Sequence, residues 1–237
     1  MKQPAYYARP GTLVRDLLAV LHPPYTAWHL SYVAIGAALA PSLDWWRLAG
    51  TLTAFLLGTG VAAHALDEWQ GRPLRTGLGD RMLLVLGVGG FLAAGMVAAV
   101  GAVVVSPWVL AWAGAGTILA AGYACEWWPA LRTDLGFALA WGGFPVLVGF
   151  WAQAETLGPG LLAVAAAATL LSVAQRALST PARFVRRSVQ EAEVVLRMDG
   201  ANESWPERRL LETWERPLRL TGWAMVLLAV GLLAGRL

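Results

Sequence analysis

The stretch "GVGGFLAAGMVAAVGAVVV", residues 87–105, contains no charged side chain. A soluble domain usually carries about 25% charged residues, whereas this chain of 237 residues is 14% charged and 57% hydrophobic, with a mean hydropathy of +0.55. A helix that is apolar on every side cannot hide its surface by packing one face against a core. We therefore expect this stretch to cross a lipid bilayer.

Several other segments have the same character. A spanning helix needs about 20 mostly apolar residues, and this criterion predicts spans at 25–42, 46–66, 82–105, 107–125, 135–153, 158–175 and 218–236. The third and fourth spans are separated at Ser106-Pro107, because proline cannot continue the hydrogen-bond ladder of a helix. The sequence thus predicts an all-α, polytopic membrane helix bundle of about seven transmembrane helices.

Polar segments flank the predicted spans. Residues 1–24 are expected to form an amphipathic N-terminal lead-in rather than a cleavable signal peptide, and residues 25–175 a bundle of six spans. Residues 176–217 are polar, and within them "RFVRRSVQEAEVVLRM" (183–198) has a helical period. We expect a basic cytoplasmic connector with a helix on the membrane surface there, followed by the final transmembrane helix at 218–236.

Basic residues are unevenly distributed among the loops. They precede the first span and follow the second, fourth and sixth spans, whereas the other loops hold only Arg47. Cytoplasmic loops of membrane proteins carry an excess of Lys and Arg. We therefore expect a multi-pass protein of the plasma membrane with its N-terminus in the cytoplasm. An odd number of spans then places the C-terminus outside.

Three clusters of polar and ionisable residues follow alternate spans and could converge on one cytoplasmic cavity. Ionisable groups at the margin of a bilayer are costly unless they are paired, hydrated or bound to a ligand, although any one of them could simply cap a helix or form an ion pair. The candidate site residues are His64, Asp67, Glu68, Arg72, Arg75, Tyr123, Arg132, Gln175, Arg176, Ser179 and Arg183.

These residue types favour a lipid with an anionic head group. Guanidinium groups match phosphate oxygens through paired hydrogen bonds. Mg²⁺ usually takes one or two carboxylates together with substrate phosphates, and Asp67 and Glu68 could supply them. His22 and His29 could join His64 as metal ligands, but hydrogen bonding at the interface explains them more simply. We expect no nucleic-acid partner, and the sequence identifies no protein partner.

Three motifs across roughly residues 20–150 carry a family resemblance. They are "LHPPYT" (21–26) before the first span, "HALDE" (64–68) with "GRPLRTG" (71–77) after the second, and "YACEWWPALRTDLG" (123–136) after the fourth. In their order and spacing they resemble the UbiA superfamily of intramembrane prenyltransferases.

The resemblance implies a UbiA-like all-α bundle whose acidic motifs hold Mg²⁺ and bind a prenyl diphosphate, so that a carbocation forms and an acceptor attacks it. It implies catalytic roles for His64, Asp67 and Glu68, with Asp67 and Glu68 as the metal ligands. The residues expected to bind the substrate are Arg72, Arg75, Tyr123, Arg132, Gln175, Arg176, Ser179 and Arg183.

The chain departs from the family pattern at both acidic motifs. His64 and Ala65 stand where the family has Asn and its first Asp, and Arg72 stands at the position of a third acid. After the sixth span, Gln175 and Ser179 are the nearest equivalents of the second acidic motif. The alternative function is therefore a non-catalytic lipid-binding or complex-forming membrane protein on the same scaffold. Its partner would be an isoprenoid diphosphate or another anionic lipid.

Overall fold

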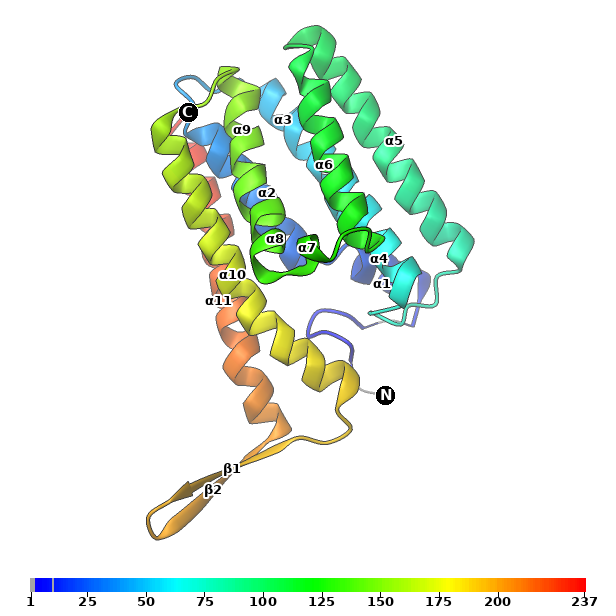
Figure 1. Cartoon of the computed structure of the whole chain (residues 1–237), viewed down its shortest axis with the longest axis vertical. Coiled ribbons are helices and arrows are strands. Elements are labelled where there is room, and N and C mark those ends of the chain that lie inside the picture. The colour runs from blue at the N-terminus through cyan, green and yellow to red at the C-terminus, as the bar shows by residue number, and fades with distance from the viewer. Residues whose placement is uncertain (1–2, 10) are drawn as a thin grey trace.

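The computed structural model describes residues 3–9 and 11–237, most of which are helical (Figure 1). The α-helices are α1 (Leu13–Val20), α2 (Pro23–Ala38), α3 (Trp45–Phe55), α4 (His64–Gly71), α5 (Asp80–Val104), α6 (Trp108–Ala124), α7 (Pro129–Arg132), α8 (Asp134–Ala138), α9 (Phe144–Ala154), α10 (Pro159–Ser188) and α11 (Glu207–Ala234). Two π-helical segments, η1 (Leu56–Ala63) and η2 (Leu139–Gly143), join α3 to α4 and α8 to α9. A hairpin of β1 (Glu193–Met198) and β2 (Ala201–Pro206) lies between α10 and α11.

Five helical segments in the described part of the chain are long and apolar enough to cross a membrane: Trp45–Gly71, Asp80–Val104, Asp134–Ala154, Pro159–Ser188 and Glu207–Ala234. The predicted helical membrane bundle is confirmed at this level. The helices α2 and α6 coincide with the first and fourth predicted spans, but they are shorter. A helix of 16 residues, such as α2, covers about 24 Å of the roughly 30 Å hydrocarbon core. The number of seven spans therefore stays a prediction.

Helices α2, α9, α10 and α11 form what we call the packed half. Its core contains Trp28, Tyr32, Val146 and Phe150. The backbones of α2 and α9 touch, because a Cβ atom built on Gly149 would lie 2.1 Å from the Val33 carbonyl oxygen. Small residues allow such close approach between membrane helices, where packing and hydrogen bonds drive association.

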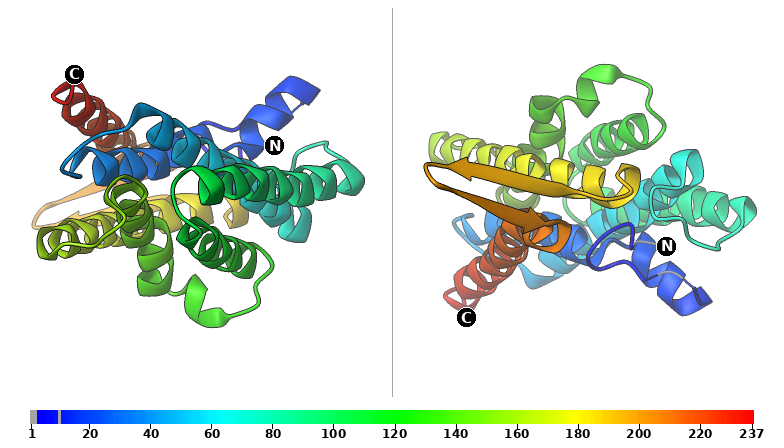
Figure 2. Two further views of the ribbon diagram at one scale, coloured as in Figure 1. Left: turned by 90° about the horizontal axis from the view of Figure 1, so that it is seen from above. Right: turned by 90° about the horizontal axis from the view of Figure 1, so that it is seen from below.

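The segments α3, η1, α5 and α6 form a second layer, which we call the hollow half. Seen along the long axis, α5 and α6 lie to one side of the molecule and α10 and α11 to the other (Figure 2). Gly50 of this half lines an open space: apart from its chain neighbours and the backbone of its own helix, no described atom lies within 4 Å of a Cβ built on it.

The N-terminal lead-in contains the short helix α1, and residues 1, 2 and 10 of it lie outside the described residues. Leu13, Val14 and Leu18 of α1 are exposed, which is typical of a helix that lies against a membrane surface. The buried Asp16 carboxylate on the opposite face accepts the Gly77 N–H at 2.9 Å. This contact ties α1 to the loop after α4.

Helices α10 and α11 continue beyond the bundle and end in the hairpin (Figure 1). The buried Glu215 of α11 forms a two-pronged ion pair with Arg186 of α10, in which Nη2 lies 2.8 Å from Oε2. Ala182, Val185 and Leu211 pack beside this pair. The two helices therefore hold the hairpin away from the bundle.

The predicted surface helix across 183–198 is wrong beyond Ser188, where the chain turns into β1. Valine is enriched in strands because its branched side chain suits a pleated surface, and Val194 and Val195 lie in β1. The two strands are joined by Asp199-Gly200, a dipeptide that is a strong hairpin signal, and Gly200 has a φ of +79°. The alternation of exposed and half-buried residues along β1 and the Asp199-Gly200 turn favour a hairpin over the helix that the apolar spacing suggested.

Candidate functional site

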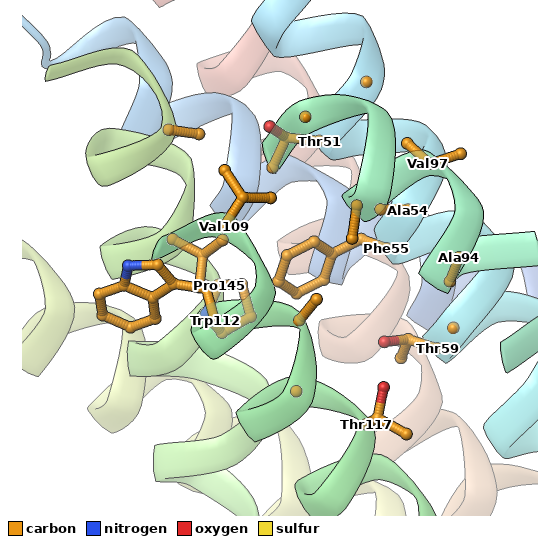
Figure 3. Close-up of a pocket in the computed structure, with 18 of the residues that line it drawn as sticks. Thr51, Ala54, Phe55, Thr59, Ala94, Val97, Val109, Trp112, Thr117 and Pro145 are labelled. Atoms are coloured by element: carbon orange, nitrogen blue, oxygen red, sulfur yellow. The ribbon is translucent and has the colours of Figure 1, made fainter. Parts of the chain in front are cut away.

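An apolar cavity of about 450 Å³ lies between the hollow half and α9 (Figure 3). Its wall includes the aromatic rings of Phe55, Trp112 and Phe144, and the volume is typical of a ligand site. Along one continuous helical segment the lining runs from Arg47 to Thr59, which is about 18 Å at 1.5 Å per residue. The cavity is thus longer than half of the roughly 30 Å hydrocarbon core.

A smaller polar pocket of about 60 Å³ adjoins the end of the cavity near α4 and α8. The two spaces share His29 and Trp141 as lining residues. Nδ1–H of the His29 ring donates to the Trp141 carbonyl oxygen at 3.0 Å. This hydrogen bond fixes the ring between the cavity and the polar pocket. The polar pocket is lined by His22, Tyr25, His29, Ala63, His64, Asp67, Tyr123, Phe137, Trp141, Gln175, Arg176, Ser179 and Arg183.

Both π-helical segments lead into this region. η1 ends at Ala63, directly before His64, and η2 contains Trp141. The Nδ1–H of His64 donates back to the Gly60 carbonyl oxygen at 3.2 Å. Such segments are rare and frequently occur at functional sites, and here both alter the helical register where the cavity meets the pocket.

His22 precedes α2 in a left-handed conformation, with a φ of 46°. Its Nδ1 is hydrogen-bonded to the Tyr7 hydroxyl at 2.7 Å, and its ring stacks on His64 with centroids 4.3 Å apart. Burial, and after it the nearby His64, Arg187 and Arg183, hold the pKa of His22 well below its usual range.

The buried Nε2 of this neutral ring has no hydrogen-bond partner among the described residues. Buried polar atoms are nearly always satisfied, so this atom is available to a ligand.

The two arginines of the pocket differ in how they are held. Arg176 is anchored, because its Nε donates to Asp134 at 2.6 Å and its guanidinium lies 5.1 Å from the Phe137 ring centroid. Arg183 has only a 3.4 Å hydrogen bond to the Thr180 hydroxyl and no carboxylate partner among the residues described. Arg183 is therefore the cation in the pocket that is best able to meet an anionic ligand.

The structure gives Glu68 a structural role in place of the predicted catalytic and metal-binding one. Its carboxylate is fully buried. It accepts the Leu74 N–H at 2.8 Å, the Thr76 N–H at 2.8 Å and the Thr76 hydroxyl at 2.9 Å. Three donors occupy both oxygens, so Glu68 shapes the loop after α4 and does not line the pocket.

Three of the predicted diphosphate ligands also lie outside the pocket lining. Arg72 pairs with Asp80, Arg75 donates to the Arg187 carbonyl oxygen at 3.0 Å, and Arg132 pairs with Glu126. For Arg72 and Arg75 the physical reason is the path of the loop after α4, which reverses at their positive φ values. Arg132 belongs to α7, where the nearby Glu126 engages it. The candidates that do line the pocket are His64, Asp67, Tyr123, Gln175, Arg176, Ser179 and Arg183.

Sequence reasoning gave too little weight to the start of α2. His22, Tyr25 and His29 all line the pocket. Their spacing of i, i+3 and i+7 places them on one side of a helical turn. This spacing was the signal that could have identified them.

The described part of the structure leaves a single carboxylate at the pocket to bind the predicted Mg²⁺. Asp67 is the one acid that lines the pocket within the described residues, and no group of three or more His, Cys, Asp or Glu side chains in that part of the chain could hold a metal ion. Mg²⁺ can be held by one carboxylate together with substrate phosphates. The metal therefore stays a prediction that requires a phosphate ligand.

Comparisons with models of protein families, with curated proteins and with solved structures give no match for this chain. The resemblance to the UbiA superfamily stays a prediction from three motifs.

Proposed function

We propose that this protein binds an isoprenoid diphosphate and transfers its prenyl group to an acceptor. The observation that carries the proposal is the junction at His29 and Trp141, where a polar pocket and a long apolar cavity meet. One amphiphile can place its head in the first and its tail in the second. The wall of the cavity is mostly apolar and, with Phe55 and Trp112, suits a hydrocarbon chain.

The head group would be recognised mainly by Arg183 and Arg176, with the hydroxyls of Tyr25 and Ser179 as further partners. Charge-assisted hydrogen bonds from guanidinium groups to phosphate are strong. The pocket of about 60 Å³ has room for only part of a diphosphate. Binding therefore requires Arg183 to swing outward, which is possible because no carboxylate of the described residues pairs with it.

Transfer breaks the bond between the allylic carbon and the diphosphate oxygen, and the diphosphate leaves with the electron pair. The arginines stabilise the leaving anion, a term that is often the largest in catalysis. The rings of Phe137, Tyr123 and Trp141 lie together near the junction, with centroids 5.3 to 6.0 Å apart. They would face the positive charge that develops on carbon. The acceptor then bonds to that carbon and loses a proton.

The pocket would open to the cytoplasm. Arg176, Arg183, Arg186 and Arg187 follow one another on the same end of α10, and basic residues concentrate on the cytoplasmic side of a membrane. We place the protein in the plasma membrane with this end inside.

A second candidate function is binding of an anionic lipid without turnover. The engagement of Glu68 by three hydrogen bonds favours it. With Glu68 engaged in its own loop, Asp67 is the one acid among the described residues that lines the pocket. Prenyl transfer that uses two acidic motifs has no counterpart in such a site.

The first test is binding of geranylgeranyl diphosphate to the purified full chain in lipid nanodiscs. Arg183→Gln should weaken binding about 10- to 100-fold, because a hydrogen bond to a charged group contributes about 1.5–3 kcal/mol. Arg208→Gln is the matched control, since Arg208 is exposed and pairs with Glu212 on α11. Equal affinities for both variants and the unmodified chain would contradict the proposed site.

The second test separates the two candidates. Release of inorganic diphosphate from the same ligand, with water as the acceptor of the prenyl group, is measured with Mg²⁺ and with EDTA, and again for Asp67→Asn. Mg²⁺-dependent release that Asp67→Asn abolishes supports the transferase. Binding that depends on Arg183 with no release under either condition supports the non-catalytic candidate.

A further inference from the structure

The hairpin of β1 and β2 is an isolated two-stranded sheet. It projects from the ends of α10 and α11 and runs sideways beneath the bundle (Figures 1 and 2). One face rests partly on α11, where the Arg209 guanidinium lies 4.3 Å from the Trp205 ring centroid. The other face, with Val195 and Arg197, is exposed. A lone hairpin is marginally stable in water, whereas three or more strands form a stable sheet.

The two edges of this hairpin are not equivalent. β2 ends in Pro206, which has no N–H to donate to a further strand, and Glu203 of β2 is paired with Arg209. A proline in an edge strand is a device that protects the strand from pairing. β1 reads "EVVLRM" and has neither proline nor glycine. The open edge of β1 is therefore the edge that can accept another strand.

We propose that β1 pairs antiparallel with β1 of a second copy of this chain, centred on Val195, to form a four-stranded sheet. In this register Glu193 lies opposite Arg197 of the second copy, and Val194 lies opposite Leu196. Two oppositely charged pairs then flank the central valines, and such cross-strand pairs are stabilising. Arg197 is exposed and has no ion-pair partner within the described chain, so it is free to make this contact.

The strand is self-complementary, as a two-fold interface requires. Moving the centre to Val194 places Glu193 opposite Val195, and moving it to Leu196 places Glu193 opposite the like-charged Asp199. The Val195 register is therefore the one that pairs Glu193 with Arg197. The membrane favours this pairing, because copies inserted in the same direction hold their hairpins at the same height relative to the bilayer. Confinement to one plane raises the effective concentration of one β1 edge at another. This interface is independent of the proposed function.

The first experiment is cysteine cross-linking in nanodiscs large enough for two copies and in liposomes. In a Cys125→Ala background, which leaves no other thiol, Val195→Cys should cross-link with a short bismaleimide. Ser204→Cys is the matched control, because Ser204 lies directly opposite Val195 in the hairpin but on β2. In the proposed dimer the two Ser204 positions are three strand spacings apart, about 14 Å, and should not cross-link with the same reagent.

The second experiment is a charge swap, which needs no cysteine at the interface. Glu193→Arg and Arg197→Glu should each weaken dimerisation about 2- to 30-fold, because each creates two like-charged pairs. The double variant restores opposite charges and should return to within about twofold of the unmodified chain. Dimerisation is measured by energy transfer between labelled copies at decreasing protein-to-lipid ratios. A monomer at every ratio, cross-linking through Ser204→Cys, or a double variant as weak as the single variants would overturn the proposal.

Discussion

The packed and hollow halves are built from similar residues but differ in what those residues do. Gly149 in the packed half brings α9 into backbone contact with α2. A Cβ atom built on Gly149 would lie only 2.1 Å from the Val33 carbonyl oxygen. Gly50 in the hollow half lines the cavity, and no described atom outside its own helix segment lies within 4 Å of a Cβ built there. Small residues in membrane helices therefore permit close packing without enforcing it.

The difference has a physical origin in the solvent. Lipid tails are as apolar as leucine, so the bilayer supplies little hydrophobic force to press helices together. Where α2 and α9 meet, complementary shape supplies the contact. Where α3 and α6 face α9, the aromatic rings of Phe55, Trp112 and Phe144 fill the space between the helices. The free-energy cost of a cavity that can admit a hydrocarbon chain is therefore lower in a membrane than in the core of a soluble protein.

The largest expected effect comes from adding one methyl group to each half. Gly149→Ala places a Cβ against the Val33 carbonyl and should destabilise the protein by about 1–3 kcal/mol or more, because backbone must move. Gly50→Ala in α3 meets no described atom outside its own helix segment and should stabilise its helix by about 0.5–1 kcal/mol. Thermal unfolding of both variants in detergent measures the difference. Equal shifts of the same sign would contradict the division into two halves.

The next effect concerns the cavity. Ala113→Phe fills space lined by α6 and should lower the affinity for geranylgeranyl diphosphate by at least about tenfold, or 1.4 kcal/mol, without a fall in the unfolding temperature. Ala115→Phe on the exposed side of the same helix is the matched control and should bind as the unmodified chain does. If Ala113→Phe binds the ligand normally, the tail does not occupy this cavity.

The smallest expected effect is on the pH dependence of stability, and it concerns the stacked rings of His22 and His64. Because burial lowers the pKa of His22 in the folded protein below the ordinary value of 6.5, its contribution to stability is complete above about pH 6.5. It is lost as the pH falls from there toward the folded-state pKa. The loss is less than about 1.4 kcal/mol per pH unit, the limit for one group.

Unfolding temperatures at about pH 7.5 and about pH 5.5 measure this loss. His22→Asn removes the titrating ring and should make the difference between the two values smaller. An unchanged pH dependence in His22→Asn would assign the effect to other groups.

The sequence predicted the site better by region than by residue. Alternate loops do meet at one end, and Asp67, Tyr123, Arg176 and Arg183 line one pocket there. Glu68 is adjacent in sequence to Asp67, but one position is 100° around a helix, and its side chain enters the loop. Nothing in the local pattern distinguishes the acid that faces the pocket from the acid that holds Leu74 and Thr76.

The sequence by itself determined that the protein is a membrane helix bundle, because nineteen consecutive uncharged residues at 87–105 have no other favourable environment. It also placed the charged loops together, since the alternation of spans fixes which loops share a side. Only the tertiary structure decided which helices touch and which stand apart, because that depends on how rings and glycines of different helices face one another. Glycine contacts closed the packed half, aromatic rings came to line the cavity, and the Asp199-Gly200 turn made a hairpin of a segment that reads as a helix.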